Sequence, residues 1–307
     1  MSDGFEVVRA FVFDGEPVRG AWVRLKTSYQ ANLEHQDYPK PVQQLLGEAL
    51  GATVLLGNSV KLKGLLTLQV QGPGPMNLLV VQLTDRFSFR GVVRLKAGLP
   101  PHLHTTETLP TPVRLDAFAG AGTLFVTMDQ GQEEQRYQGV VSLEAGSLTQ
   151  CLEDYFARSE QLLTRLWLYC DGESVAGLML QQLPEATALA RGAHAAELFT
   201  ELCVLAETVT AAELFGLSCE QVLHRLFHEH ALRLFEPQAV FFQCGCSKER
   251  VNGILKSLGS AEVESILKEQ GQVEIRCEFC NRLYRYDPID ALNVLKPDSV
   301  TGSVKWH

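Results

Sequence analysis

The sequence predicts an α+β protein. A mixed β-sheet domain with packed helices comes first, a helical segment follows, and a small domain built around four cysteines ends the chain. Strand-like runs separated by Gly-containing turns alternate with amphipathic helical segments up to about residue 184. Helix formers without a strong strand signal occupy residues 185–238, and two closely spaced cysteine pairs lie within 239–307. We therefore expect an N-terminal core domain (1–184), a helical linker (185–238) and a C-terminal cysteine domain (239–307).

The first strands and the first long helix follow from local patterns near the N-terminus. Residues 5–26 contain two strand-like runs around Asp14-Gly15-Glu16-Pro17, a Gly-containing turn that favours a hairpin. Pro41 suits the first turn of a helix, and apolar residues recur at three- and four-residue steps from Val42 to Leu56. This part of the chain therefore predicts a β-hairpin followed by one helix with a broad apolar face.

The sheet is expected to continue beyond that helix. Leu66, Leu68 and Val70 alternate with polar residues, and Gly72-Pro73-Gly74-Pro75 requires a turn. The other elements predicted for this domain are strands at 77–84, 87–95, 123–128 and 136–143, a long loop at 97–122, a helix with apolar residues from Leu148 to Leu166, and strands near 166–170 and 174–182.

The linker combines a negative surface with several short amphipathic helices. Between residues 185 and 238 there are eight acidic residues and only three arginines. Apolar residues recur at helical spacing from Leu198 to Val209 and again from Val222 to Phe227. Short helices of this kind bury little surface by themselves, so the segment must pack on the N-terminal sheet, on the cysteine domain or on a partner. We therefore expect the linker to be conditionally stable.

Four cysteines near the C-terminus form the strongest candidate site in the sequence. Cys244 and Cys246 make a CxC, and Cys277 and Cys280 make a CxxC. Thiolates that are presented in pairs from short loops supply the four ligands that tetrahedral Zn²⁺ prefers. The sequence therefore predicts a small C-terminal zinc domain with four cysteine ligands.

The segment between the cysteine pairs predicts two short helices. Ser247 can cap a helix that ends at Gly259, and Ser260 can cap another that ends at Gly271. A module of this size gains little from its own apolar core, whereas structural zinc contributes on the order of 10–16 kcal/mol in small peptides. Loss of the metal is therefore expected to unfold residues 239–300.

Zinc would hold the four sulfurs as thiolates, the form that oxidants attack. Because Cys244 and Cys246 are only two residues apart, a disulfide between them would close a tight, strained ring that is readily reduced again. Spacing alone does not distinguish a purely structural zinc site from a redox-sensing one.

Other candidates for chemistry have simpler explanations. His224 and His228 lie four residues apart on a predicted helix, with His230 nearby, and a solvated helix face accounts for them. Phosphate-loop, nucleophile-elbow and HExxH motifs are absent from the sequence, so we expect no enzyme. Four further cysteines lie in apolar contexts without ligand-like spacing and are expected to be buried core residues: Cys151, Cys170, Cys203 and Cys219.

Charge and hydropathy indicate which classes of partner are unsuited to this chain and in which cellular compartment we expect it. The net charge of −9, from 27 basic and 36 acidic residues, disfavours sequence-independent nucleic-acid binding. Residues 1–6 lack the basic start of a secretory signal, and no segment approaches the roughly 20 apolar residues that span a bilayer. We expect a cytoplasmic protein with reduced thiols and without nucleic-acid or membrane partners.

Several motifs across the chain match one known family. The most specific are Cys244-Gly-Cys-Ser-Lys-Glu-Arg-Val251, Cys277-Glu-Phe-Cys-Asn281 and the following Tyr284. With them, the chain resembles the bacterial redox-regulated heat shock protein 33 family, also called the 33 kDa chaperonin, nearly from end to end. Supporting matches are Val18-Arg19-Gly20, Leu45-Leu46-Gly47-Glu48, Leu68-Gln-Val-Gln-Gly72, Tyr137-Gln138-Gly139, Tyr155-Phe-Ala-Arg-Ser-Glu-Gln161 and Gly177-Leu-Met-Leu-Gln181.

The resemblance implies a redox-regulated, ATP-independent molecular chaperone, a holdase that binds unfolding proteins and prevents aggregation during oxidative stress. It implies one Zn²⁺ per chain in the reduced state, held by Cys244, Cys246, Cys277 and Cys280. Oxidation would join Cys244 to Cys246 and Cys277 to Cys280, release zinc, and unfold the zinc domain and the linker. A homodimer that binds unfolded or partly folded client proteins would result. Which clients and which oxidant are involved, and whether the linker docks on the N-terminal domain, do not follow from the sequence.

Two other classes stay open at this point. A constitutive scaffold or interaction protein would use a purely structural zinc ribbon to hold a partner-docking surface. A thiol-disulfide exchange enzyme would turn over through the CxxC with a dithiol reductant. Neither alternative predicts a gain of anti-aggregation activity that is coupled to zinc release.

Overall fold

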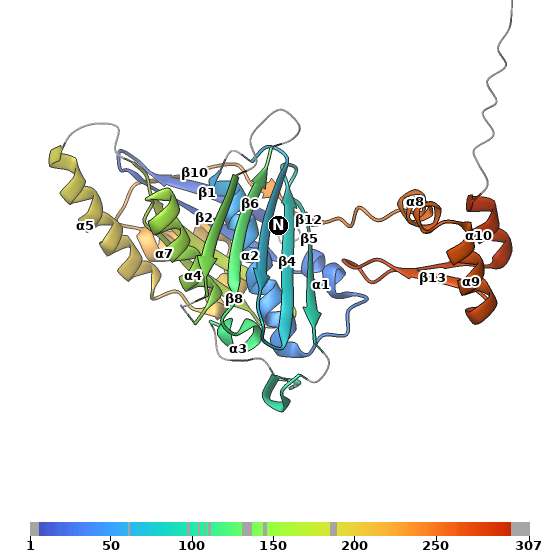
Figure 1. Ribbon diagram of the computed structural model, residues 1–307. Helices are drawn as coiled ribbons and strands as arrows, with labels where there is room; N and C mark the ends of the chain where they lie inside the picture. The colour runs from blue at the N-terminus through green and yellow to red at the C-terminus, as the bar shows by residue number, and fades with distance from the viewer. Residues whose placement is uncertain are drawn as a thin grey trace, which may run out of the picture. The chain divides into compact units, whose positions relative to one another are not determined.

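The chain forms two compact units, Met1–Gln243 and Cys244–His307, in the computed structural model. The α+β class is confirmed, since the first unit contains sheets and helices (Figure 1). The second unit contains the cysteine cluster. Expectations for residues 1–5, for 185–188 at the start of the linker, and for 296–307 lie outside the part of the chain that the structure describes. The described residues are 6–60, 62–96, 99–103, 105–107, 109, 112–130, 137–143, 146–184 and 189–295.

One sheet of the first unit, sheet A, is built around the N-terminal hairpin. The two predicted runs form β1 (Val7–Phe13) and β2 (Val18–Leu25), and the turn between them contains Gly15 at a φ of +81°. The sheet continues through β9 (Val175–Gln182) to β8 (Thr164–Cys170). On its other side, β1 pairs with β10 (Leu232–Leu234) and β11 (Gln238–Ala239), and the described pairings of this sheet are all antiparallel.

The second sheet, sheet B, is a meander with one short parallel strand at its edge. Its strand order is β12-β5-β4-β3-β6-β7, in which β12 runs parallel to β5 and the other neighbours are antiparallel. The predicted Gly-Pro turn joins β3 to β4. The strands are β3 (Leu65–Gln71), β4 (Met76–Thr84), β5 (Ser88–Leu95), β6 (Thr123–Asp129), β7 (Tyr137–Ser142) and β12 (Phe241–Phe242).

The predicted long helix, α2 (Lys40–Ser59), is buried over most of its length and contacts strands of both sheets (Figure 1). Gly47 permits the close approach to sheet A, because a Cβ atom at this position would lie 2.4 Å from Cys170 Sγ. The inner core therefore joins side chains of both sheets to this helix, as Val23, Leu50 and Leu68 illustrate. The smaller elements of this part are α1 (Thr27–Leu33), the 3-10 turn η1 (Pro101–Leu103), α3 (Asp116–Ala119), α4 (Leu148–Tyr155) and the π-helical turn η2 (Phe156–Glu160).

The linker helices pack on the outer face of sheet A. The sequence had left open whether the linker docks on the N-terminal domain. These helices, together called the helical layer, are α5 (Leu189–Ala206), α6 (Ala211–Gly216) and α7 (Cys219–Phe227). An outer core joins Trp22 and Leu178 of the sheet to Leu202 of α5 and Phe227 of α7. None of the helices within the described ranges is long and apolar enough to cross a bilayer.

Polar contacts also hold the helical layer on the sheet. The guanidinium of Arg24 donates to the carbonyls of Phe215 and Leu217, each at 3.0 Å. Tyr169 donates its hydroxyl to the Val209 carbonyl at 3.2 Å. These bonds and the outer core make the helical layer part of the first unit.

The second unit has a small core of its own. Its helices are α8 (Lys248–Leu258), α9 (Ser260–Gln270) and α10 (Pro288–Leu295), and a hairpin is formed by β13 (Val273–Arg276) and β14 (Leu283–Tyr286). Among the described residues, the core cluster of this unit contains Val251, Leu255, Val263, Val273, Tyr286 and Ala291.

Several elements differ from the prediction. The helix expected up to Leu166 ends with η2, because Gln161 adopts the left-handed backbone conformation at a φ of +55° and β8 begins at Thr164. The predicted loop at 97–122 contains η1 and α3. Ser260 does not cap α9; Gly259 is the N-cap residue and no side chain caps that helix.

The linker also contains strands where helices alone were expected. β10 and β11 form because they pair with the edge of β1, which lies more than 200 residues away along the chain (Phe13 with Leu232). The division into 1–184, 185–238 and 239–307 stays a prediction about which segments fold independently.

Candidate metal centre

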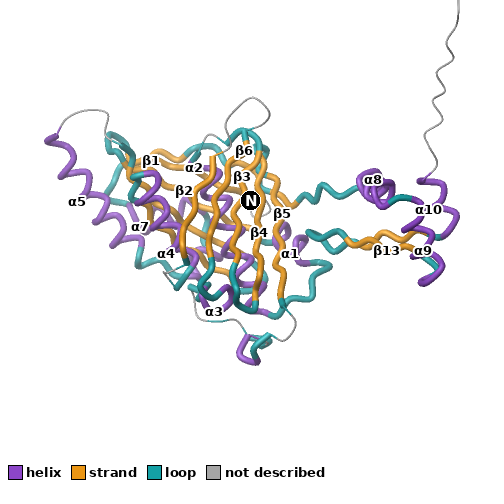
Figure 2. Tube along the Cα trace, in the orientation of Figure 1, coloured by secondary structure: helices purple, strands orange, loops and turns teal. Residues whose placement is uncertain are grey.

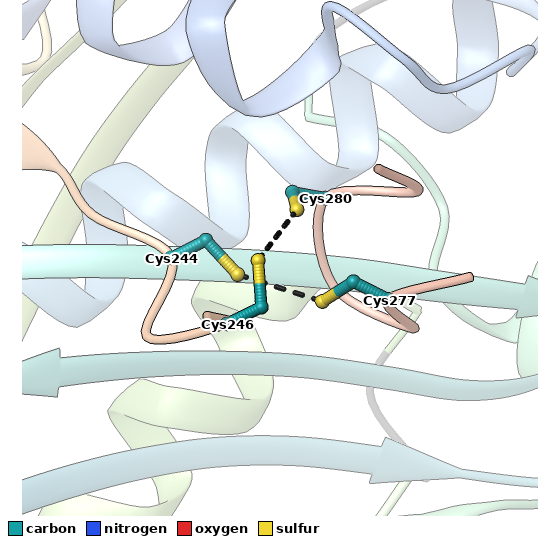
Figure 3. Close-up of side chains that lie close together, drawn as sticks. All are labelled: Cys244, Cys246, Cys277 and Cys280. Atoms are coloured by element: carbon teal, nitrogen blue, oxygen red, sulfur yellow. Dashed lines mark hydrogen bonds between the residues drawn. The ribbon is translucent and has the colours of Figure 1, made fainter. Parts of the chain in front are cut away.

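The four predicted cysteines converge on one point of the second unit. The sulfur atoms of Cys244, Cys246, Cys277 and Cys280 all lie within 4.8 Å of one another, and their side chains point toward a common centre (Figure 3). Cys244 Sγ lies 3.6 Å from Cys277 Sγ, and Cys246 Sγ lies 3.4 Å from Cys280 Sγ. Each of these short contacts joins one cysteine of the CxC to one cysteine of the CxxC. The structure therefore brings the two motifs together as one cluster.

The CxC lies in the loop that leads into α8. Ser247 caps this helix as predicted, since its Oγ accepts a hydrogen bond from the Arg250 N–H at 3.3 Å. The Arg250 side chain reaches back and donates to the Gly245 carbonyl at 2.8 Å, which closes the loop around the residue between the two cysteines. The cap and this contact together hold Cys244 and Cys246 in place.

The CxxC lies in the tight connection between β13 and β14. The Asn281 N–H donates to the Cys277 carbonyl at 2.8 Å, and the Cys277 N–H donates to the Arg282 carbonyl at 3.0 Å. Asn281 closes the turn in the left-handed conformation, at a φ of +54°. This hairpin was not predicted, although the alternation of apolar Val273 and Ile275 with polar neighbours is typical of a short strand.

The thiols of the cluster differ in acidity. Burial raises the pKa of Cys244 and that of Cys280. At Cys246, burial raises the pKa, but the Tyr284 hydroxyl and the neighbouring thiols lower it by more, so that the pKa of Cys246 falls to about 7. Cys246 is therefore partly ionised near neutral pH, and a cation that approaches the cluster meets a thiolate.

The geometry and the donors fit one tetrahedral metal ion. A Zn–S distance of about 2.3 Å separates the sulfurs of a tetrahedral site by roughly 3.8 Å. The sulfur contacts of 3.4 Å and 3.6 Å and the outer limit of 4.8 Å bracket that value. Four sulfur donors favour zinc over Mg²⁺ or Ca²⁺, which prefer oxygen ligands. Among the residues that the structure describes, this is the one group of three or more potential ligands.

The other four cysteines are separate from this cluster. Cys151, Cys170, Cys203 and Cys219 are buried in the first unit. Burial raises the pKa of Cys170, of Cys203 and of Cys219 to about 12. They are therefore poor nucleophiles at neutral pH.

The three linker histidines considered in the sequence, His224, His228 and His230, do not form a group of potential metal ligands. His224 and His228 lie on the exposed side of α7, and their ring centroids are 6.1 Å apart. His230 packs edge-on against Phe13, with ring centroids 6.0 Å apart. His224 and His228 therefore lie on a solvated helix face, as the sequence predicted.

The fold and the cysteine cluster define a class of protein in which a large α+β unit is followed by a small four-cysteine unit. The chain belongs to the Hsp33 protein family, whose family model matches residues 6–287. This match confirms the resemblance that the motifs indicated.

The relatives match nearly the whole chain. The 33 kDa chaperonin of Shewanella denitrificans is 41% identical over 300 residues, 98% of each chain. The 33 kDa chaperonin of Azotobacter vinelandii is 45% identical over 293 residues, 94% of each chain. The crystal structure of the 33 kDa chaperonin (heat shock protein 33 homolog) of Thermotoga maritima has the same fold, with a TM-score of 0.77 at 24% identity over 94% of this chain and 98% of that one.

Proposed function

We propose that the protein is a redox-regulated, ATP-independent chaperone, a holdase that binds unfolded or partly folded client proteins in the cytoplasm and prevents their aggregation. Its membership in the Hsp33 family and the name of its relatives, 33 kDa chaperonin, support the chaperone role. The observation that carries the proposal is the convergence of four sulfurs in a unit whose own core is very small. Such a unit can convert thiol chemistry into unfolding.

In the reduced state, Cys244, Cys246, Cys277 and Cys280 would hold one Zn²⁺ per chain. The ion would supply the free energy that six buried residues cannot, because modules of this size gain little from apolar burial alone. It would also keep the sulfurs as thiolates, the form in which they react with oxidants.

Oxidation would then remove the ligands in pairs. Two thiolates lose two electrons to a peroxide, an S–S bond forms, and the O–O bond of the peroxide breaks and takes up protons to give water. By the family resemblance, Cys244 would pair with Cys246 and Cys277 with Cys280. Because four thiolates no longer surround the ion, zinc leaves and the second unit unfolds.

Unfolding of the second unit would loosen the helical layer, which precedes it in the chain. The outer core beneath that layer includes Trp22, Leu178 and Leu180 of sheet A, all of them buried. Apolar surface of this kind, once exposed, binds apolar segments of other proteins. The same exposure would favour a homodimer of the oxidised chain.

The test follows three quantities in one experiment. The reduced, zinc-loaded protein is treated with hypochlorite, or with peroxide under mild unfolding stress, and zinc release, helicity and suppression of client aggregation are recorded together. We expect zinc release, loss of helicity and gain of activity to coincide, and dithiol reduction with added zinc to reverse all three. Cys203→Ser, outside the cluster, should respond as the unmodified chain does.

Two results would contradict the proposal. A scaffold with a structural zinc site would show no activity coupled to zinc release. A thiol-disulfide exchange enzyme would turn over a disulfide substrate with a dithiol reductant and would not suppress aggregation.

A further inference from the structure

Residues 231–243, here called the strap, lie between the helical layer and the first cysteine ligand and pair with both sheets. Figure 1 labels the strap strands β10 and β12, and Figure 2 shows the strands of the two sheets in orange. β10 and β11 lie antiparallel beside β1 at the edge of sheet A. β12 lies parallel beside β5 at the edge of sheet B. One continuous segment therefore covers one edge of each sheet in the first unit.

The strap is attached through its main chain. Its N–H groups donate to carbonyls of both sheets: Phe235 to Ala10 at 2.9 Å, Val240 to Glu6 at 2.9 Å, Phe241 to Phe87 at 3.2 Å, and Gln243 to Phe89 at 2.9 Å. Gln243 is the residue directly before Cys244, so the pairing with sheet B ends where the cysteine cluster begins.

Apolar burial contributes little to this attachment. Val240 is the one fully buried residue of the strap, and Phe235 and Phe241 are each 43% exposed. A segment held by hydrogen bonds with few buried contacts opens at low free-energy cost. The strap runs directly into Cys244, so unfolding of the cysteine cluster would leave unfolded chain at the C-terminal end of the strap.

The strap shows what kind of chain fits the two edges. Leu232 and Leu234 pack against the outer core, and Val240 and Phe242 pack against the inner core. Within each pair the residues are two apart, which is the side-chain period of an extended strand. Each edge therefore accepts an extended segment with an apolar side chain at every second position.

We propose that the edges of β1 and β5 are a docking site where oxidised protein binds extended, apolar segments of its clients by strand addition, and that the strap occupies this site in the reduced state. The proposal rests on the proposed holdase function and adds a main-chain docking site to the apolar surface of the outer core that the same function would expose. Main-chain hydrogen bonds provide affinity for a client segment of any sequence. The alternating apolar positions favour client segments that have an apolar side chain at every second residue. Unfolding proteins offer such segments, since their buried strands become exposed.

A peptide with the strap sequence tests the edges directly. The peptide covers residues 231–243 and carries a fluorophore, and its anisotropy is measured with the full-length protein in the reduced and in the oxidised, zinc-free state. One variant carries N-methyl groups on Phe235 and Phe241, whose N–H groups bond to the sheets. The matched control carries them on Leu234 and Phe242, whose N–H groups point away from the edges by the alternation of a strand.

We expect the unmodified peptide and the control to bind the oxidised protein alike and the reduced protein poorly. The Phe235 and Phe241 methylated peptide should bind about tenfold more weakly or worse, because each lost main-chain hydrogen bond leaves a carbonyl unpaired. The three peptides should displace an aggregation-prone client in the same order.

The outcomes separate the two proposals. If the oxidised protein suppresses aggregation but both methylated peptides bind alike, or none binds, strand addition is wrong and the holdase function stands. If the edge amides of β1 and β5 become protected from hydrogen exchange in oxidised protein without client, in proportion to protein concentration, a second copy occupies the edges and the client site is wrong. If oxidation yields no anti-aggregation activity, the holdase function is wrong and this inference falls with it.

Discussion

Each of the two units of the chain is stabilised internally by a different kind of interaction. The first unit has an inner core around α2 and an outer core under the helical layer. In the described part of the second unit, the core cluster consists of six buried apolar residues, and four sulfurs form the cysteine cluster. Burial of apolar side chains does not depend on the redox state of the solution, whereas thiolate ligation does. The redox switch that we propose therefore requires an oxidant to act on the second unit and to leave the strands of the first unit intact.

The largest difference between the units should appear when a sulfur ligand is removed. Cys280→Ala takes away one of four donors, and we expect α8, α9 and the β13–β14 hairpin to unfold, since structural zinc contributes on the order of 10–16 kcal/mol. Hydrogen exchange followed by mass spectrometry measures the unfolding of these elements, and a zinc assay measures the loss of the metal. Cys203→Ala, in the outer core, should keep the zinc and the protection of the second unit. Protection of α8 and α9 that survives Cys280→Ala would show that the small core suffices.

A leucine-to-alanine substitution should change the zinc affinity when it is made in the core of the second unit, and only the unfolding free energy of the first unit when it is made in the outer core. Leu255 and Leu202 are both fully buried, and Leu→Ala at such sites costs about 2–5 kcal/mol. In the second unit, where folding and metal binding are coupled, Leu255→Ala should weaken zinc binding by about 30-fold or more. Leu202→Ala should lower the unfolding free energy of the first unit and leave zinc affinity unchanged. Competition with a chromophoric chelator reports the affinities, and equal values for both variants would contradict the coupling.

A buried carboxyl makes the first unit sensitive to pH. Burial raises the pKa of Glu48 from 4.5 to about 8, more than the Val113 main chain lowers it. Below pH 4.5 both the folded and unfolded states are protonated. From there to about pH 8 the unfolded state loses the proton first, so the unfolding free energy falls by up to about 1.4 kcal/mol per pH unit.

Glu48→Gln removes this titration and should flatten the dependence between pH 5 and 8. Denaturant unfolding of the first unit at several pH values measures the slope, and Glu107→Gln, a substitution of an exposed glutamate, is the control that should keep it. A slope that persists in Glu48→Gln would assign the pH dependence to another group.

The smallest effect is expected in the helical layer. Ser218 accepts from the Gln221 N–H at 3.3 Å and forms a capping box at the start of α7. Ser218→Ala should destabilise this helix by about 1 kcal/mol and raise hydrogen exchange in α7, while the zinc content stays unchanged. Thr200→Ala, which removes an exposed hydroxyl from the middle of α5, serves as the comparison and should have a smaller effect. Exchange in α7 that does not change would show that the outer core alone holds the layer.

Local patterns predicted the elements whose partners are near in the chain. The β1–β2 hairpin, α2 and the meander of β3, β4 and β5 follow from turn residues and from apolar periods of 2 and 3.6. The four cysteines were predicted because ligand spacing is also a local property. The helix expected to reach Leu166 was wrong, since apolar residues at 163 and 166 fit the helical period but belong to the start of β8 and the residues before it.

Elements with distant partners were not predicted. β10, β11 and β12 are two or three residues long and become strands only because β1 and β5 offer unpaired edges. The β13–β14 hairpin is short and largely polar, so its periodicity is weak.

By itself, the sequence determined which sulfurs can bind a metal, which segments alternate as strands or helices, and that the linker has apolar faces to cover. These features depend on neighbouring residues, so they can be recognised without a fold. Only the tertiary structure decided that the linker helices cover the outer face of sheet A and that the strap covers an edge of each sheet. An apolar face or a free strand edge binds any complementary partner, and the partner is selected by the packing of the whole unit.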